Sequence, residues 1–195
     1  DKAKDYAAED ADVTFRLYKK FLKNLKSEKL INIYEIFEKP LIKILAFMEI
    51  EGVEIDSKFL KSLSQKFEKK IIKLEREIFK ISKKEFNIGS PKQLGEIIYN
   101  DLKIAGLKKT KKGGFATSAS VLEDLAFKGN KFPKLILDWR QLSKLKNTYS
   151  DALPEHVNPN TKRVHTSFLL AATKTGRLAS SDPNIQNIPI NSDDG

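Results

Sequence analysis

Apolar residues recur three and four positions apart over much of the chain, which is the period of an α-helix. The clearest case extends from Ser57 to Lys84, where the apolar positions are Leu60, Leu63, Phe67, Ile71, Leu74, Ile78 and Ile81. A helix over this range would be about 40 Å long, at about 1.5 Å per residue. Its apolar stripe predicts that a second helix covers one face along most of that length.

The range from Phe132 to Leu153 has a matching stripe, formed by Leu135, Ile136, Trp139, Leu142, Leu145 and Tyr149. We expect the two helices to pack against each other as an antiparallel hairpin. A coiled coil between two chains is the alternative, and it is less favoured because the chain already contains a partner of suitable length. The predicted fold class is mainly α, with a long antiparallel helical hairpin and a short β segment near the C-terminus.

Shorter helices are expected on either side of the hairpin and between its arms. Their predicted ranges are 5–26, 30–37, 41–50, 90–101 and about 120–127. Pro40 suits a first helical turn, and Asp56 suits the N-cap of the long helix. Ser90 and Gln93 fit a capping box, in which each side chain accepts a hydrogen bond from the other residue's backbone N–H.

Polar stretches separate these helices. The range from Lys108 to Ser118 is rich in Lys and Gly and predicts an exposed cationic loop. Asn158 to Asn160 predicts a turn, and Arg163 to Leu170 has the composition of a strand. From Thr173 to Ile190 the chain is polar and interrupted by Gly and Pro.

The charge of the chain is unevenly distributed. The net charge is +10, and the range 57–150 holds 22 Lys and Arg residues against 9 Asp and Glu residues. Charge alone supports two interpretations equally, a Lys-rich solvated surface or a segment that faces a polyanion such as nucleic acid.

Several classes of protein and site are excluded. With no Cys and only two His residues, disulfides and a zinc site are effectively ruled out. The best apolar stretch, Leu41 to Ile50, contains Lys43 and is too short to span a bilayer. We therefore expect a soluble, cytoplasmic monomer with no membrane partner. The chain begins at Asp1 rather than Met and ends in a polar stretch, which we interpret as a fragment of a longer protein.

The polar run from Thr175 to Ile190 concentrates hydrogen-bond donors in a way that neither a core nor an ordinary loop requires. Gly176 permits close approach of the backbone to a ligand. Minor-groove acceptors occupy similar places in every correct base pair, so donors of this kind can check pairing without reading sequence. The donors are Arg177, Asn184, Gln186 and Asn187. Tying down the loop is an alternative role, above all for Asn187.

This run, with Arg163 to Thr166 before it, resembles the segment just upstream of the first catalytic carboxylate motif in bacterial family A DNA polymerases. The resemblance implies that Arg177 contacts the minor groove at the primer terminus. It also implies that Asn184, Gln186 and Asn187 contact template and primer. The implied activity is DNA-directed DNA polymerisation in replication and repair, in a nucleoid-associated enzyme. Its implied partners are primer–template DNA and dNTPs, and its implied cofactor is Mg²⁺.

The resemblance extends over nearly the whole chain. Phe86 to Leu94 resembles the motif that enters the tip of the family's thumb domain, and Leu142 to Tyr149 resembles the helix from thumb to palm. The residues that the resemblance assigns to duplex binding are Ser90, Lys92, Lys108, Lys109, Thr110, Ser118, Arg140, Lys144 and Lys146. For each lysine taken alone, solvation is the alternative.

Near the N-terminus, Tyr6 and Asp10 lie four residues apart and so share one face of the predicted helix. They resemble the last motif of the family's 3′–5′ exonuclease domain. The resemblance implies that Asp10 binds a metal ion and that Tyr6 orients the attacking water, in a two-metal hydrolysis. The pattern is weak by itself, and the neighbouring Asp5, Glu9 and Asp12 have surface interpretations.

The resemblance divides the chain into four segments. Residues 1–28 would be the C-terminal helix of the exonuclease domain, 29–56 palm scaffold, 57–148 the thumb and 149–195 the start of the palm. The palm carboxylates are absent from this sequence, so we expect the chain alone to grip DNA and to be inactive. The alternatives are a polymerase with a degenerate exonuclease domain and a non-catalytic basic helical nucleic-acid-binding module. A simple binding module has no use for the run after Thr175.

Overall fold

The computed structural model describes residues 2–104 and 113–188. The chain divides into two compact units. The first unit comprises Asp1–Val53 and His165–Gln186, and the second comprises Glu54–Val164 and Asn187–Gly195.

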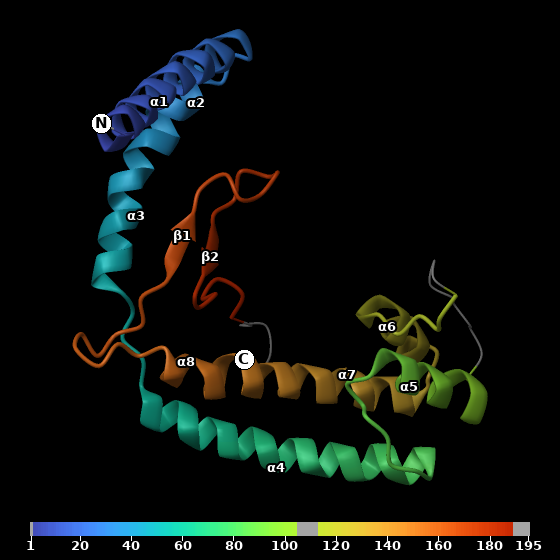
Figure 1. The fold of residues 1–195 in the computed structure, drawn as a ribbon. Coiled ribbons are helices and arrows are strands. Elements are labelled where there is room, and N and C mark those ends of the chain that lie inside the picture. The colour runs from blue at the N-terminus through green and yellow to red at the C-terminus, as the bar shows by residue number, and fades with distance from the viewer. Residues whose placement is uncertain (1, 105–112, 189–195) are drawn as a thin grey trace. The chain divides into compact units, whose positions relative to one another are not determined.

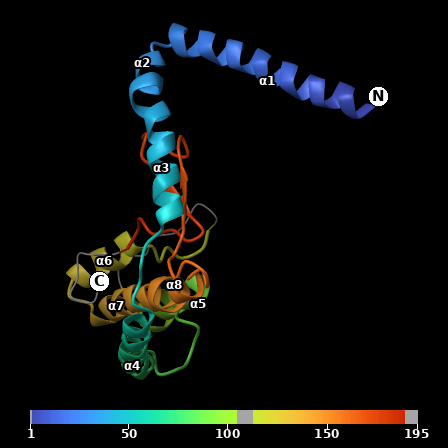
Figure 2. The same cartoon turned by 90° about the vertical axis from the view of Figure 1, so that its left-hand side faces the viewer.

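A long helical hairpin dominates the second unit. Its first arm is α4 (Ser57–Ser82), and its second arm is α7 (Lys131–Lys144), which continues through the π-helical η3 (Leu145–Asp151) into α8 (Ala152–Glu155). Figure 1 shows the two arms side by side, and Figure 2 looks along them. The mainly helical fold with a long hairpin and a short β segment is thereby confirmed.

Polar contacts between the arms confirm that they are antiparallel. Lys131 pairs with Glu77 at 3.5 Å, Trp139 Nε1 donates to Glu75 Oε1 at 3.0 Å, and Lys146 pairs with Glu68 at 3.1 Å. As one residue number rises the other falls, which only an antiparallel pair produces.

The ends of α4 follow from local chemistry. Asp56 is the N-cap, and its Oδ1 accepts from the backbone N–H groups of Lys58 and Phe59 at 3.0 and 2.9 Å. At the other end Lys83 adopts the left-handed conformation, with φ 57°, and this stops the helix two residues before the predicted Lys84.

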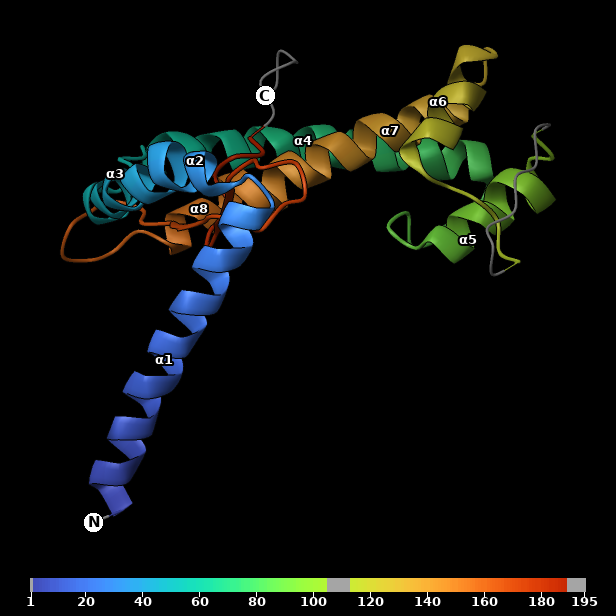
Figure 3. The same ribbon diagram turned by 90° about the horizontal axis from the view of Figure 1, so that it is seen from above.

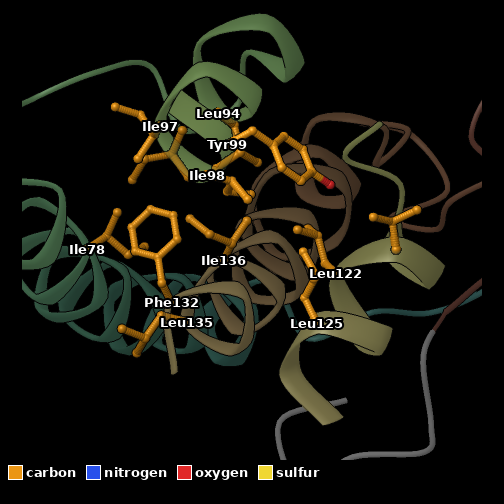
Figure 4. Packing of buried hydrophobic residues seen from close by; sticks show 12 residues of the cluster. Ile78, Leu94, Ile97, Ile98, Tyr99, Leu122, Leu125, Phe132, Leu135 and Ile136 are labelled. Carbon is orange, nitrogen blue, oxygen red and sulfur yellow. The ribbon is translucent and has the colours of Figure 1, made fainter. Parts of the chain in front are cut away.

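The hairpin tip (residues 83–104 and 113–130) packs around the end of α4 and the beginning of α7. It contains α5 (Pro91–Glu96), the π-helical η2 (Ile97–Asp101) and α6 (Ala119–Phe127). Figure 3 shows these elements gathered at that end of the hairpin. Side chains from all of these elements meet in one apolar core, drawn in Figure 4. Its completely buried members are Ile78, Leu94, Ile98, Leu122 and Ile136.

The predicted capping box at α5 forms only in part. The Ser90 hydroxyl accepts from the Gln93 N–H at 3.5 Å, as expected. The Gln93 Oε1, however, accepts from the Asn87 N–H at 2.7 Å, while the Ser90 N–H donates to the Asn87 carbonyl. The prediction that Gln93 accepts from the Ser90 N–H was therefore wrong, because this N–H already donates to Asn87 in the tight turn before α5.

The first unit contains α1 (Lys2–Ser27), α2 (Ile31–Ile33), the π-helical η1 (Tyr34–Glu38) and α3 (Lys39–Glu51). Pro40 lies in the first turn of α3, as predicted. The strands β1 (Ser167–Leu169) and β2 (Ala179–Ser181) pair antiparallel, with Phe168 opposite Ser180. Glu49 of α3 links to β1, because its Oε1 accepts from the Phe168 N–H at 2.5 Å. A strand was predicted over Arg163–Leu170, and β1 forms only its part from Ser167 to Leu169.

Candidate nucleic-acid interface

The start of α5 holds two of the residues predicted to bind the duplex. Ser90 is half-buried because its hydroxyl is used as the N-cap, whereas Lys92 is exposed in the first turn. Pro91 at the first helical position is already restricted to a helical φ, which fixes where this turn begins.

Two side chains fix the segment that leads into α6. The Arg140 guanidinium donates to the Thr117 carbonyl at 2.6 Å, and the Tyr99 hydroxyl donates to the Ala116 carbonyl at 3.1 Å. The exposed Ser118 follows directly, and its hydroxyl lies 3.2 Å from that of Ser120. Burial lowers the pKa of Arg140 from its ordinary value. Arg140 therefore positions the residue next to Ser118, and a DNA contact of its own stays a prediction.

Lys146 lies between two carboxylates. Its Nζ is 2.8 Å from Asp151 Oδ2 and 3.1 Å from Glu68 Oε2, and its side chain is only 19% exposed. Hydrogen bonds to Asp151 and then Glu68 raise the pKa of Lys146. Burial alone would raise the pKa of Asp151, but hydrogen bonds from Lys146 and Ser64 outweigh it and lower that pKa. This arrangement favours a structural role for Lys146, whereas the neighbouring Lys144 is exposed.

The polar loop (residues 182–188) follows β2 and is held by its own side chains. Ser180 is 4% exposed, and its hydroxyl accepts from the Ile185 N–H at 3.1 Å and donates to Asn184 Oδ1 at 3.3 Å. Asn184 Oδ1 also accepts from the Gln186 N–H at 3.1 Å. The Asn184 side-chain oxygen thus holds the loop in shape. Asn184 and Gln186 are nevertheless exposed.

Thr166 holds the beginning of the same loop. Its buried hydroxyl lies 3.0 Å from the Ser181 carbonyl and 2.7 Å from the Pro183 carbonyl, and so can donate to either. Thr166 belongs to the motif singled out from the sequence, and the structure gives it a positioning role that its residue type alone could not reveal.

Arg177 is exposed just before β2. Gly176 takes φ 73°, a conformation that glycine adopts without strain, and the Thr173 hydroxyl donates to the Arg177 carbonyl at 2.8 Å. Within the part of the chain that the structure describes, the Arg177 guanidinium has no ion-pair partner, Asp182 included. Its five donors are therefore available to a ligand.

Asn187 is attached to the hairpin through its backbone. The hydroxyl of Tyr149, in η3, donates to the Asn187 carbonyl, and the Asn187 residue itself is exposed. The sequence marked Tyr149 only as a core position.

Tyr6 and Asp10 are both exposed on α1, one helical turn apart. Asp10 can supply one carboxylate, which fits a Mg²⁺ ion held by one or two protein carboxylates with waters and phosphates. Among the described residues, no three His, Cys, Asp or Glu side chains gather as a metal-binding group. Of the predicted duplex-binding residues, Lys108, Lys109 and Thr110 lie outside the described part.

Residues 57–195 match DNA polymerase family A, and this range is well over half of the chain. The chain belongs to DNA polymerase family A. The match covers both arms of the hairpin, its tip and the polar loop. The resemblance inferred from the motifs is confirmed.

Similar proteins extend the family A match to the first residues of the chain. DNA polymerase I of Rhizobium leguminosarum is 51% identical over 195 residues, which are 100% of this chain and 19% of that protein. A thermostable DNA polymerase I of Thermus thermophilus is 45% identical over 186 residues, which are 94% of this chain and 22% of that protein. The chain therefore spans about a fifth of the length of these relatives.

A solved structure shares the fold of this family A chain. It is the POL domain of Pol1 from M. smegmatis in complex with DNA primer-template and dNTP. The TM-score is 0.78 at 34% sequence identity, over 88% of this chain and 30% of that chain. Among the described residues, no helix combines the length and apolar character that a membrane span requires.

Proposed function

We propose that this chain is the part of a DNA-directed DNA polymerase that grips primer–template duplex and contacts the primer terminus. The observation that carries the proposal is the exposed donor set of Arg177, Asn184 and Gln186. Thr173 holds the backbone of Arg177, and Ser180 and Thr166 hold that of the polar loop. Donors on a fixed backbone can test the position of minor-groove acceptors, because a misplaced base pair moves the acceptor and not the protein.

The hairpin tip supplies the sequence-independent part of this grip. The residues proposed to contact the duplex there and on α7 are Ser90, Lys92, Lys108, Lys109, Thr110, Ser118, Arg140 and Lys144. Lys146 in η3 belongs to the same predicted set, but its contacts with Glu68 and Asp151 favour a structural role. Neutralising phosphates with cations releases counterions, so the local excess of 22 cationic over 9 acidic residues in 57–150 supports this proposal. The complex of the M. smegmatis domain with primer-template and dNTP supports the same two partners here.

Residues 57–148 would then form the thumb, 29–56 and 149–195 parts of the palm, and 1–28 the end of a proofreading 3′–5′ exonuclease domain. In that domain Asp10 would hold one Mg²⁺ ion and Tyr6 would orient the attacking water. A bound metal pair would supply the charge stabilisation for hydrolysis or nucleotide transfer. Because the chain spans about a fifth of its relatives, we propose that most of the ligands for both metal pairs come from other parts of the polymerase.

Arg177→Ala in the intact polymerase tests the primer-terminus role. We expect single-turnover extension of a matched primer to slow by about tenfold to a hundredfold, because a misaligned 3′ end loses orientation. DNA affinity should change far less, and a mismatched primer should slow less, because the mismatch has already displaced the acceptor. The 195-residue chain alone, run as a control with dNTPs and Mg²⁺, should add no nucleotide.

Equal slowing of matched and mismatched primers, with a lower melting temperature, would show that Arg177 only stiffens the loop. Lys174→Ala is the matched control, since it removes a nearby exposed cation that the proposal gives no role. Extension by the 195-residue chain alone would refute its assigned inactivity.

A further inference from the structure

Tyr149 makes a contact that the proposed function does not use. It lies in η3, is 6% exposed, and its hydroxyl donates to the backbone carbonyl of Asn187, 38 residues further along the chain. A buried tyrosine hydroxyl needs a polar partner, and here that partner is the last peptide group of the proposed primer-contacting residues.

The next residue lies beside an apolar cavity. Ile188 lines an apolar cavity of about 330 Å³ at the base of the hairpin, together with Phe59, Leu63 and Tyr149. Asn187 is thus attached to the hairpin through its carbonyl, and the Ile188 side chain, 43% exposed, lies beside the same part of the hairpin.

The rest of the polar loop is fixed from its other end. Ser180 bonds the Ile185 N–H, and Asn184 bonds the Gln186 N–H, both at 3.1 Å. The Tyr149 bond holds the next peptide but one, because the Asn187 carbonyl belongs to the peptide between Asn187 and Ile188. If that bond is lost, the chain after Gln186 is no longer held at a fixed point.

We propose that Tyr149 is a positioning residue for primer extension, which fixes the polar loop by anchoring the carbonyl of Asn187. The inference rests on the proposed function, because it assigns Tyr149 to the same donors. Tyr149 itself touches neither primer nor nucleotide. It acts by keeping the Gln186 and Asn187 amides where a correct base pair presents its acceptors, so its loss affects the rate on bound DNA rather than DNA affinity.

Tyr149→Phe in the intact polymerase is the test, since it removes the hydroxyl and keeps the ring. We expect single-turnover extension of a matched primer, at saturating DNA and dNTP, to slow by about fivefold to tenfold, the effect of one hydrogen bond. A mismatched primer should slow less, so the ratio of matched to mismatched rates falls. The dissociation constant for DNA should stay unchanged.

Tyr99→Phe is the matched control. Tyr99 is also buried, also lies in a π-helical segment, and also donates from its hydroxyl to a backbone carbonyl, that of Ala116 at 3.1 Å. Tyr99→Phe removes the same hydroxyl group, but at the tip of the hairpin instead of at its base. We expect it to leave the ratio of matched to mismatched rates unchanged, whatever it does to DNA affinity.

The outcomes separate the two claims. If Arg177→Ala lowers the ratio and Tyr149→Phe does not, the positioning role is rejected and the proposed function stands. If neither variant lowers it, the proposed function fails as well. Should Tyr149→Phe lower the melting temperature, both rates are measured at a temperature at which the variant is folded. A ratio equal to that of the parent polymerase would then overturn the inference.

Discussion

Gly95 lies inside α5, where a glycine costs about 1 kcal/mol relative to alanine. Its structural reason is the close approach of Phe115. A Cβ at position 95 would lie 2.6 Å from the Phe115 Cβ, a distance at which one of the two must move. Phe115 also packs against the Tyr99 ring, with centroids 5.0 Å apart. One missing methyl group therefore lets Phe115 lie against α5.

Gly95→Ala should destabilise the tip even though alanine favours helix. We expect a cost of about 1–3 kcal/mol, since extra volume in a packed site forces the backbone or Phe115 to shift. Hydrogen exchange of the α5 and η2 amides, measured in the intact polymerase, should quicken. Glu96→Ala is the control at the next, exposed position and should change exchange little. Slower exchange in Gly95→Ala would mean that Phe115 adapts and helix propensity decides.

Single residues also mark the limit of what the sequence predicts. The identity of Arg177 and the glycine before it pointed to an exposed donor on special backbone, and both features are present. Tyr149 and Asn187, or Arg140 and Thr117, lie 38 and 23 positions apart, so no local pattern pairs them. Such bonds depend on how the helices pack, which periodicity alone does not specify.

At the scale of elements, the sequence predicted what amphipathic periodicity determines. The stripes on α4 and α7 implied an antiparallel pair, and Asp56 and Pro40 marked the beginnings of helices as expected. The π-helical turns η1, η2 and η3 were predicted simply as helix, because one extra residue per turn leaves the pattern almost unchanged. Only the reciprocal bond of the capping box at Ser90 was predicted wrongly, because Asn87 engages both the Gln93 oxygen and the Ser90 N–H.

The cluster of Lys146, Glu68 and Asp151 joins η3 to α4 and makes their packing depend on pH. The pKa of Lys146 is raised above 10.5, so its contribution is complete below about pH 10.5 and is lost as pH rises through the raised value. The pKa of Asp151 is lowered below 3.8. The contribution of Asp151 to stability is therefore complete above about pH 3.8 and is lost as pH falls through the lowered pKa.

Lys146→Met keeps most of the side-chain volume and removes the charge. We expect it to destabilise the hairpin by at most about 1 kcal/mol, because Glu68 and Asp151 are 51% and 37% exposed. The loss of melting temperature relative to the parent should be constant from about pH 5 to about pH 9 and smaller near about pH 11. Lys144→Met, on the exposed face, should show no such loss. A loss that persists undiminished near pH 11 would mean that the charge of Lys146 is not what stabilises the hairpin.

At the scale of the whole molecule, the two units differ in how much core each contains. Nearly all buried apolar side chains described belong to the hairpin unit, whereas Leu45 is the buried apolar residue described in the first unit. Large apolar side chains of α1 to α3 are exposed, among them Phe15, Phe37 and Phe47. Apolar surface of this extent marks a contact region. It fits our proposal that the chain functions within a longer polymerase.

The distribution of charge leads to the last prediction, which concerns DNA binding by the intact polymerase. Replacing Lys108, Lys109, Lys111 and Lys112 together by Gln should flatten the dependence of log affinity on log salt, by about 0.9 for each phosphate that is no longer neutralised. These residues lie outside the described part of the chain, so the expectation rests on the cationic loop in the sequence. DNA affinity should fall by the same factor on unrelated duplex sequences, because phosphate contacts carry no sequence information.

The control replaces an equal number of exposed lysines on α4 by Gln, namely Lys61, Lys66, Lys69 and Lys80. If net charge alone attracts DNA, both quadruple variants flatten the slope equally. If the tip grips the duplex, only the first does so, and an unchanged slope in that variant would show that the tip lysines are merely solvated.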